Sequence, residues 1–315
     1  MILIVNNEID FTTDLVCLWL NKTKKKYIRI SSIRSITQVF SDVLTRLKIN
    51  VINHNAKIDL ANLKSIFYKN SDFGYSLHVS PNHTADAMLT KFIDTEWATL
   101  KEYLKFVINK NTVVIGNIVA NTVNKLIVLN IANGIGIKIP ETRIVSTKEA
   151  VESFGANKVS IITKPISEVM LSVTEKGKFL NYTRIVDKDE SIADNITPTL
   201  LQEYIEKKYE VRTYFLHNKF WSIAIFSQSQ SQTKTDYRNY SYDIPNRSEP
   251  FLLPTSLKNK IKQLAKQLQL NSGSVDFIYS TKNEFYFLEI NPIGQFSNVS
   301  SNGNFNIEKY IAEQL

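Results

Sequence analysis

Two carboxylates near the C-terminal end of the sequence have the spacing of a metal site. Asp276 lies in "GSVDFIY" and Glu289 lies in "FYFLEIN", and both segments have the aromatic and branched residues of strands. If the strands form a hairpin centred on 282–283, Asp276 lies directly opposite Glu289. Asn291, two residues on, then points to the same face. Two carboxylates and an amide oxygen are therefore expected on one patch.

A cation between these carboxylates would explain why they face each other, because like charges directly opposed destabilise a sheet. Oxygen ligands with room for water and phosphate are typical of magnesium rather than zinc. The alternative is that Glu289 is paired with an arginine from elsewhere in the fold, and the hairpin by itself does not distinguish the two.

Three cations stand where they could neutralise the phosphates of a nucleotide. Lys125 begins a predicted helix, Lys164 ends a predicted strand in "SIITKPIS", and Arg212 lies inside a predicted strand in "YEVRTYF". Each one alone is equally well explained as a surface cation whose aliphatic stem covers apolar neighbours.

The elements that must position these residues fall into three regions. In the first, "MILIVNN", the helical pattern "DFTTDLVCLWLNK" and "KYIRISS" alternate as in an α/β domain. In the second we expect a helix over 123–132, a helix capped by Ser146, a strand ending at Lys164 and a hairpin through "EKGKF". In the third we expect strands over 211–216 and 220–226, then a long polar loop and the amphipathic helix "SLKNKIKQLAKQLQL".

Composition limits the partners and the compartment. Lys and Arg number 38 against 30 Asp and Glu, but they are dispersed, so we expect an acidic ligand and no nucleic acid. The single cysteine, Cys17, excludes an internal disulfide framework and fits a reducing compartment. No apolar stretch approaches the roughly 20 residues that span a bilayer, and the first residues lack a signal-peptide pattern. A cytoplasmic protein without membrane contact is expected.

The order of these segments resembles the ATP-grasp carboxylate–amine ligase superfamily. The likeness covers about residues 113–315 and rests on "NKLIVLNIANGIGIKIPET", "TKPIS", "LQEYIEKKYEVR", "GSVDF" and "FLEINPIGQF". More narrowly, "AIFSQSQSQTKTDYRNY", "PNRSEPFLLP" and "LNSGSVDFIY" resemble the peptide maturases that make graspetides, ribosomal peptides of microviridin type, in their "grasp-with-spasm" group.

The resemblance implies an α/β (α+β) protein with the ATP-grasp fold. An N-terminal α/β domain of the pre-ATP-grasp type would span 1–112. A central domain would span 113–198, and a C-terminal domain with an antiparallel sheet and the metal site would span 199–315. Many ATP-grasp enzymes have a glycine-rich loop after the strand lysine, whereas this chain has only Gly177 there.

The resemblance also implies roles for individual residues. Lys125 and Lys164 would contact the phosphates of ATP, and Lys164 and Arg212 would act on the phosphoryl group in transit. The hinge beside adenine would be Gln202, Glu203, Tyr204 and Ile205, with base contacts from the backbone of Glu203 and Ile205. Glu210 would bind ribose, while Asp276, Glu289 and Asn291 would hold Mg²⁺. Arg238, and with it Asp236, would lie where the acceptor peptide enters.

The implied activity is that of an ATP-dependent macrocyclase. It would phosphorylate Asp or Glu side chains of a ribosomal precursor peptide, recognised through its leader, and join them to Thr or Ser hydroxyls or Lys amines. We expect ω-esters first, and a homodimer. A ligase adding free amino acids to a protein C-terminus would use the same ATP site and remains an alternative. A non-catalytic peptide-binding module and a nucleic-acid binder are the other two.

Overall fold

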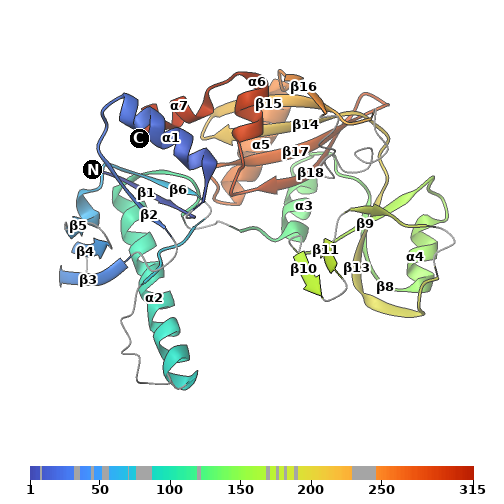
Figure 1. The fold of residues 1–315 in the computed structure, drawn as a ribbon. Coiled ribbons are helices and arrows are strands. Elements are labelled where there is room, and N and C mark those ends of the chain that lie inside the picture. Colours follow the sequence, from blue (N-terminus) through green and yellow to red (C-terminus); the bar gives the residue numbers. More distant parts are fainter. Residues whose placement is uncertain are drawn as a thin grey trace.

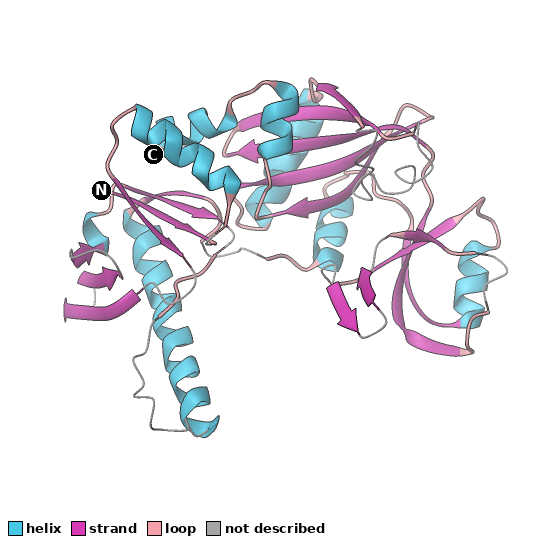
Figure 2. Ribbon diagram, viewed as in Figure 1, coloured by secondary structure: helices cyan, strands magenta, loops and turns pink. Residues whose placement is uncertain are grey.

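The structure is a computed structural model and shows three principal sheets, one in each region of the chain (Figure 1). It describes residues 1–7, 9–31, 36–43, 46–51, 57–69, 71–75, 87–118, 122–167, 171–174, 177–180, 183–187, 191–228 and 246–315. The C-terminal sheet lies between the N-terminal sheet and the central sheet, and both chain ends lie on the N-terminal side (Figure 2).

The N-terminal sheet is parallel, as the alternation of strands and helices predicts. Its order is β2 (Tyr27–Ser31), β1 (Ile2–Asn6), β6 (Ser65–Lys69) and β7 (Val113–Ile115). Helices α1 (Phe11–Lys22) and α2 (Ala87–Asn111) connect its strands. All five residues of β1 are buried, because the sheet is covered on both faces. β7 belongs to this sheet, three residues past the expected boundary at 112, and the division into domains stays a prediction.

A small antiparallel sheet packs beside the parallel one. It is formed by β3 (Ile36–Val43), β4 (Arg46–Val51) and β5 (Lys57–Asp59), followed by the short helix η1 (Leu60–Asn62). Its inward side chains, such as Ile49 and Ile58, share a core with Leu3 and Ile66 of the parallel sheet. The sequence did not predict these strands.

The central sheet is antiparallel and small. Its order is β12 (Arg184–Ile185), β9 (Ile161–Lys164), β13 (Asn195–Glu203) and β8 (Thr142–Thr147). Helix α4 (Lys148–Gly155) covers one face through Val151 and Phe154. The expected hairpin through "EKGKF" is present as β10 (Leu171–Thr174) and β11 (Gly177–Leu180). The cap of α4 is Thr147, whose hydroxyl accepts from the Ala150 N–H, and not Ser146, which lies inside β8.

The C-terminal sheet is antiparallel and has helices on both faces. Its order is β16 (Arg247–Pro250), β15 (Lys219–Phe226), β14 (Lys207–Leu216), β17 (Ser272–Ser280) and β18 (Phe285–Asn291). Helices α3 (Lys125–Gly134) and α5 (Thr255–Gln267) pack on one face, against Phe215, Phe277 and Phe287. Helices α6 (Ser297–Gly303) and α7 (Ile307–Gln314) pack on the other face, where Leu216 and Ile223 share a core with Ile4 and Phe67 of the N-terminal sheet. The two sheets are thus joined by one core.

Candidate active site

The β17–β18 hairpin brings the two carboxylates together. Asp276 is paired with Glu289, and Ser274 is paired with Asn291, so the expected convergence on one face is observed. The turn differs from the expected symmetric one. It has three residues, 281–283, with Asn283 in the left-handed region, and a bulge between Asp276 and Phe277 then shifts the register by one residue.

The neighbouring strand β14 adds its own charged side chains to this face. Arg212 lies opposite Asp276, and Glu210 lies opposite Ile278 two pairs further along. Because directly paired residues point to the same side of a sheet, Glu210, Arg212, Asp276 and Glu289 all lie on one face. We call it the charged face. The opposite face carries the apolar core that α3 and α5 cover.

Arg212 binds Asp276 directly. Its Nη1 lies 3.3 and 3.1 Å from the two carboxylate oxygens of Asp276, and its Nη2 donates to the Ser274 hydroxyl at 3.2 Å. Both side chains are largely buried, at 13% and 10% exposed. An arginine pairing therefore exists on this face, but on Asp276 and not on Glu289, the residue for which the sequence left it as an alternative to a metal. It compensates the charge of Asp276 and holds Arg212 at the centre of the charged face.

The donor set of this face fits magnesium that is also bound to a substrate. Within the described chain no group of three or more His, Cys, Asp or Glu side chains gathers, so an all-protein metal cage is absent from these residues. Magnesium keeps several waters and is usually held by one or two carboxylates together with substrate phosphates. Asp276 and Glu289 supply two such carboxylates. The Asn291 amide oxygen accepts from the Ile293 N–H at 3.0 Å, which fixes its position beside them.

Glu210 is held in place at the other end of the charged face. Its carboxylate accepts from Lys207 Nζ at 2.5 Å and from the Ser227 hydroxyl at 2.9 Å. The side chains of Lys207 and Glu210 are 1% and 7% exposed. A carboxylate has about four acceptor sites and is the kind of acceptor that the hydroxyls of a sugar need.

The two lysines expected at the phosphates are brought to one place by α3 and β9. Lys125, the first residue of α3, donates from Nζ to the carbonyls of Pro165 and Ser167, at 3.0 Å each. These carbonyls directly follow Lys164, which ends β9. Lys164 pairs with Leu200, so its side chain lies on the face of the central sheet opposite α4. The β10–β11 hairpin follows within seven residues.

The hinge between β13 and β14 leaves one backbone N–H and one backbone carbonyl facing the same side of the chain. The Glu203 N–H donates to the Glu141 carbonyl at 3.0 Å, whereas the Tyr204 N–H donates to the Ser160 carbonyl on the other side at 3.1 Å. In a regular ladder the Glu141 N–H would return a bond to the Glu203 carbonyl. It donates instead to Glu203 Oε1 at 2.9 Å.

The Glu203 carbonyl and the Ile205 N–H therefore face the same edge. Among the described residues the Ile205 N–H has no backbone hydrogen-bond partner. A carbonyl and an N–H two residues apart on one strand edge match an adenine, whose amino group donates and whose neighbouring ring nitrogen accepts. The backbone contacts that the resemblance implies for Glu203 and Ile205 are thus geometrically open.

Gln202 carries an unsatisfied acceptor on the same side as Lys164. The residue is fully buried, and its Nε2 donates to the Thr142 hydroxyl at 2.8 Å. Its Oε1 has no hydrogen-bond partner within the described residues. A buried acceptor without a partner costs free energy, and a donor group on a bound ligand would satisfy it.

A cavity of about 380 Å³ opens beside the hinge. Its walls are the hinge residues 203–206, the residues 157–160 before β9, and the β17–β18 turn with Tyr286. It therefore lies between the central and the C-terminal sheets.

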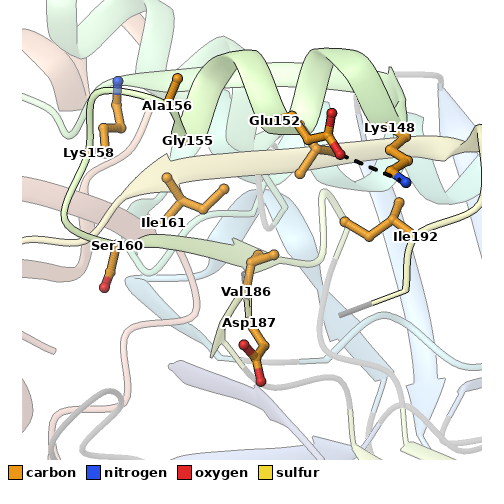
Figure 3. Close-up of a pocket in the computed structure, with 11 residues that line it drawn as sticks. Lys148, Glu152, Gly155, Ala156, Lys158, Ser160, Ile161, Val186, Asp187 and Ile192 are labelled. Atoms are coloured by element: carbon orange, nitrogen blue, oxygen red, sulfur yellow. Dashed lines mark ion pairs between the residues drawn. The ribbon is translucent and has the colours of Figure 1, made fainter. Parts of the chain in front are cut away.

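A second cavity, of about 290 Å³, lies under α4 (Figure 3). Ile161, Val186 and Ile192 form its apolar wall, and Lys148 and Glu152 form an ion pair of 3.9 Å at its rim. Ile161 faces α4, so this cavity is on the other side of the central sheet from Lys164.

Several contacts of the site were not predicted from the sequence. Lys207 binds Glu210, and Ser274 binds Arg212. Neither Lys207 nor Ser274 belongs to a motif, although each lies within five residues of a predicted site residue. Asn117 was also missed. Its amide group links the start of β17 to the Pro292 carbonyl that directly follows Asn291. Arg238 and Asp236 lie outside the described residues, and their assignment to the peptide stays a prediction.

Solved structures decide the fold. No family model matches the chain, and no curated protein matches it. The RiPP-associated ATP-grasp ligase of Chryseobacterium gregarium, in complex with ADP and a leader and core peptide, superposes with a TM-score of 0.76 at 22% identity, covering 99% of this chain and 94% of that one. The chain has the ATP-grasp fold.

Two other peptide-processing proteins with this fold are similar over the whole chain. The macrocyclase MdnC of Microcystis aeruginosa, bound to the precursor peptide MdnA, gives a TM-score of 0.73 at 21% identity, covering 99% of this chain and 98% of its own. The ATP-grasp ligase PsnB, complexed with a minimal precursor, Mg and ADP, gives 0.71 at 16% identity, covering 99% and 96%. The fold class expected from the sequence, an ATP-grasp α/β protein, is confirmed.

Proposed function

We propose that this protein is an ATP-dependent ligase that closes rings in a ribosomal precursor peptide. It would activate Asp or Glu side chains and join them to Thr or Ser hydroxyls as ω-esters or to Lys amines as ω-amides. The observation that carries the proposal is the charged face, where Arg212, Asp276 and Glu289 meet within a fold whose similar structures hold ADP and precursor peptides.

The chemistry follows from the residues on this face. A carboxylate does not react with an alcohol or amine, because its leaving group would be oxide. Transfer of the γ-phosphoryl group of ATP gives an acyl phosphate with a good leaving group. The hinge and Gln202 orient the base, Glu210 orients the ribose, and Lys125 and Lys164 bind the phosphates. Arg212, once turned from Asp276, stabilises the charge in transit by electrostatics.

Asp276, Glu289 and Asn291 are the residues that would hold Mg²⁺. A magnesium ion held there would supply positive charge that neutralises the phosphates of ATP. This chain's own contribution is to fix the ligands before the ion arrives, through the β17–β18 register and the hydrogen bond from Ile293 to Asn291.

The peptide partner is proposed from the complexes of the similar structures, which contain leader, core or precursor peptides. A homodimer and a cytoplasmic location remain predictions. None of the described helices, including the 25 residues of α2, is apolar enough to cross a membrane. A ligase that adds free amino acids to a C-terminus stays the alternative, and it would turn over small amino acids without any leader.

The test is co-expression with short reading frames encoded nearby, followed by mass spectrometry for loss of water from the peptide. Asp276→Asn and Glu289→Gln should each lower dehydration by at least about 100-fold, since each removes a negatively charged ligand of the proposed Mg²⁺ site. Glu152→Gln, on the far side of the central sheet, is the matched control and should keep full activity. Undiminished dehydration by either site variant would refute the metal assignment, and leader-independent addition of amino acids would favour the alternative.

A further inference from the structure

Lys69 is a buried cation that the proposed mechanism does not use. It ends β6, is 5% exposed, and its Nζ has no hydrogen-bond partner among the described residues. Its Nζ lies over the ring of Phe296, at 4.2 Å from the ring centroid. Burying an ammonium group without a hydrogen-bonding partner is costly, so a ligand is a reasonable explanation for its presence.

Arg29 places a second unsatisfied donor on the same face. Its Nε donates to Asn6 Oδ1 at 2.8 Å, and its Nη1 binds Asp14 at 2.6 Å. Its Nη2 is buried and has no partner within the described chain. In the parallel register Asn6 pairs with Lys69, and Ile4 pairs with Arg29, so Arg29, Asn6 and Lys69 lie side by side on neighbouring strands. We call these three residues the Lys69 cluster.

The cluster lies at the carboxyl ends of parallel strands, where open α/β sheets bind ligands. The acidic residue whose charge acts on Lys69 is Asp10. Its carboxylate is already engaged at the start of α1, where it accepts from the N–H groups of Thr12 and Thr13 and from the Thr13 hydroxyl. Asp10 therefore lowers the cost of burying Lys69 without forming a hydrogen bond to it.

The cluster also continues the charged face. The ring of Phe296, which covers Lys69, lies 5.0 Å between centroids from the ring of Tyr214. Tyr214 is two residues from Arg212 on β14, so the two side chains point to the same side about 6.5 Å apart along the strand. Glu210, Arg212, Tyr214, Phe296 and Lys69 thus follow one another from the ribose end of the proposed site towards the N-terminal sheet.

We propose that Lys69 and Arg29 bind the carboxylate that is phosphorylated, an Asp or Glu side chain of the peptide. This inference rests on the proposed function. A carboxylate oxygen forms a bond to the γ-phosphorus of ATP, the bond from that phosphorus to the β–γ bridging oxygen breaks, and its electron pair leaves with ADP. Lys69 and Arg29 remain protonated and hold the second carboxylate oxygen. The ring of Phe296 must move off Lys69 for the carboxylate to enter.

The proposal gives the N-terminal sheet a part in binding the peptide, in addition to Arg238, which the resemblance places where the acceptor peptide enters. The main test is Lys69→Met, which keeps the length of the side chain and removes its charge. Lys57→Met is the matched control, because Lys57 also lies over a ring, at 4.4 Å from Phe40, but is exposed on β5.

Kinetics are measured with the precursor found by co-expression. Lys69→Met should raise the apparent KM for the peptide or lower kcat by roughly 10- to 100-fold, as expected for a lost charge-assisted hydrogen bond. The KM for ATP should stay within about twofold. The melting temperature should not fall, since an unpaired buried charge is removed. A lower melting temperature together with an unchanged peptide KM would show a purely structural lysine and overturn the proposal.

A second measurement does not depend on ligase activity. The melting temperature of the whole protein is compared in sodium acetate, sodium phosphate and sodium chloride at equal ionic strength. Acetate should stabilise the wild-type protein and Lys57→Met more than chloride does, and Lys69→Met should lose this difference. Equal effects of acetate and chloride, or selective stabilisation by phosphate alone, would overturn the carboxylate site. Because this result stands without any turnover, failure of the carboxylate site and failure of the proposed function are distinguishable.

Discussion

At the level of single residues, the buried cations of this protein divide by how they are partnered. Lys207 and Arg212 each bind a carboxylate of the charged face, at 2.5 and 3.1 Å. Among the described residues, Lys69 has as partners an aromatic ring and the charge of Asp10, a carboxylate engaged elsewhere. The first two cations are held by carboxylates of the chain itself, whereas Lys69 would find its hydrogen-bonding partner in a ligand.

Lys69 should make folding stability depend on pH in a measurable way. Burial lowers its pKa from 10.5 to about 8, against the opposing charge of Asp10. The unfolded chain therefore binds more protons than the folded one between these two values, so the free energy of unfolding rises with pH across that window. Lys69→Met lacks this dependence. It should be more stable than the wild type at pH 7, by on the order of 3 kcal/mol, and the difference should vanish by about pH 10.5.

Urea unfolding of both proteins at pH 7, 9 and 10.5 measures this difference, since the other lysines titrate equally in both. A difference that does not change with pH would show that Lys69 is solvated in the native state.

At the level of elements, the hinge shows how one side chain can keep a strand edge open. The Glu203 carboxylate takes the Glu141 N–H, which would otherwise close the ladder onto the Glu203 carbonyl. In Glu203→Ala that N–H is free to pair with the backbone and compete with the base. The dissociation constant for ATP should then rise about fivefold to tenfold, for about 1 kcal/mol of competing hydrogen bond.

Glu206→Ala is the control for the hinge, because Glu206 lies in the same segment and is exposed. Nucleotide titration by calorimetry, with melting temperatures for both variants, makes the comparison. Equal affinities in the two variants would mean that the adenine does not use this edge.

Elements whose pattern is local could be predicted from the sequence. The register of the β17–β18 hairpin shows where such prediction stops. Asp276 was expected opposite Glu289, and it is, but a three-residue turn and a bulge together produce the pairing. The alternation of side chains fixes which residues of one strand share a face. A turn of odd length shifts the pairing of the two strands by one residue, and a bulge, which the sequence does not mark, is needed to restore it. The cap at Thr147 differs by one residue from the expected Ser146 for a similar reason, since either hydroxyl could begin α4.

The partners that come from distant segments could not be predicted. Arg212 with Asp276 depends on β14 lying beside β17, and Lys125 reaches Pro165 only because α3 lies near the end of β9. The Lys69 cluster depends on the order of three parallel strands. The small β3–β5 sheet was missed although β4 alternates strictly between polar and apolar residues, because β3 does not alternate and β5 has only three residues.

At the level of the whole molecule, the sheets are joined unequally. The N-terminal and C-terminal sheets share one core, in which Ile4 and Phe67 meet Leu216 and Ile223. The central sheet stands apart from the N-terminal sheet in Figure 1 and has its own core with α4, in which five of the described side chains are buried. Few buried contacts mean a low cost of local movement, so we expect the central sheet with Lys164 to move over the nucleotide while the other two sheets stay fixed.

Asn117 links the N-terminal sheet to the C-terminal sheet by hydrogen bonds. It follows β7 of the N-terminal sheet and is 6% exposed. Its Nδ2 donates to the carbonyls of Ser272 and Pro292, at 2.8 and 2.6 Å, and its Oδ1 accepts from the Asn271 N–H at 2.9 Å. The same link includes Asn271, whose side chain binds the backbone of β7 in return.

Asn117→Ala should therefore destabilise the fold and loosen the segment that follows the proposed metal ligand Asn291. It leaves buried backbone groups of β17 and of Pro292 without their partners, which should cost about 2–4 kcal/mol of unfolding free energy. Urea unfolding followed by circular dichroism measures this loss.

Asn62→Ala removes an exposed amide that binds Asp59 and should change stability by no more than about 0.5 kcal/mol. Because the N-terminal and C-terminal sheets share one core, they should unfold in a single transition, and Asn117→Ala should shift that transition to lower urea concentration. Equal stabilities of the two variants, or a separate early transition of the N-terminal sheet, would show that Asn117 does not join the sheets.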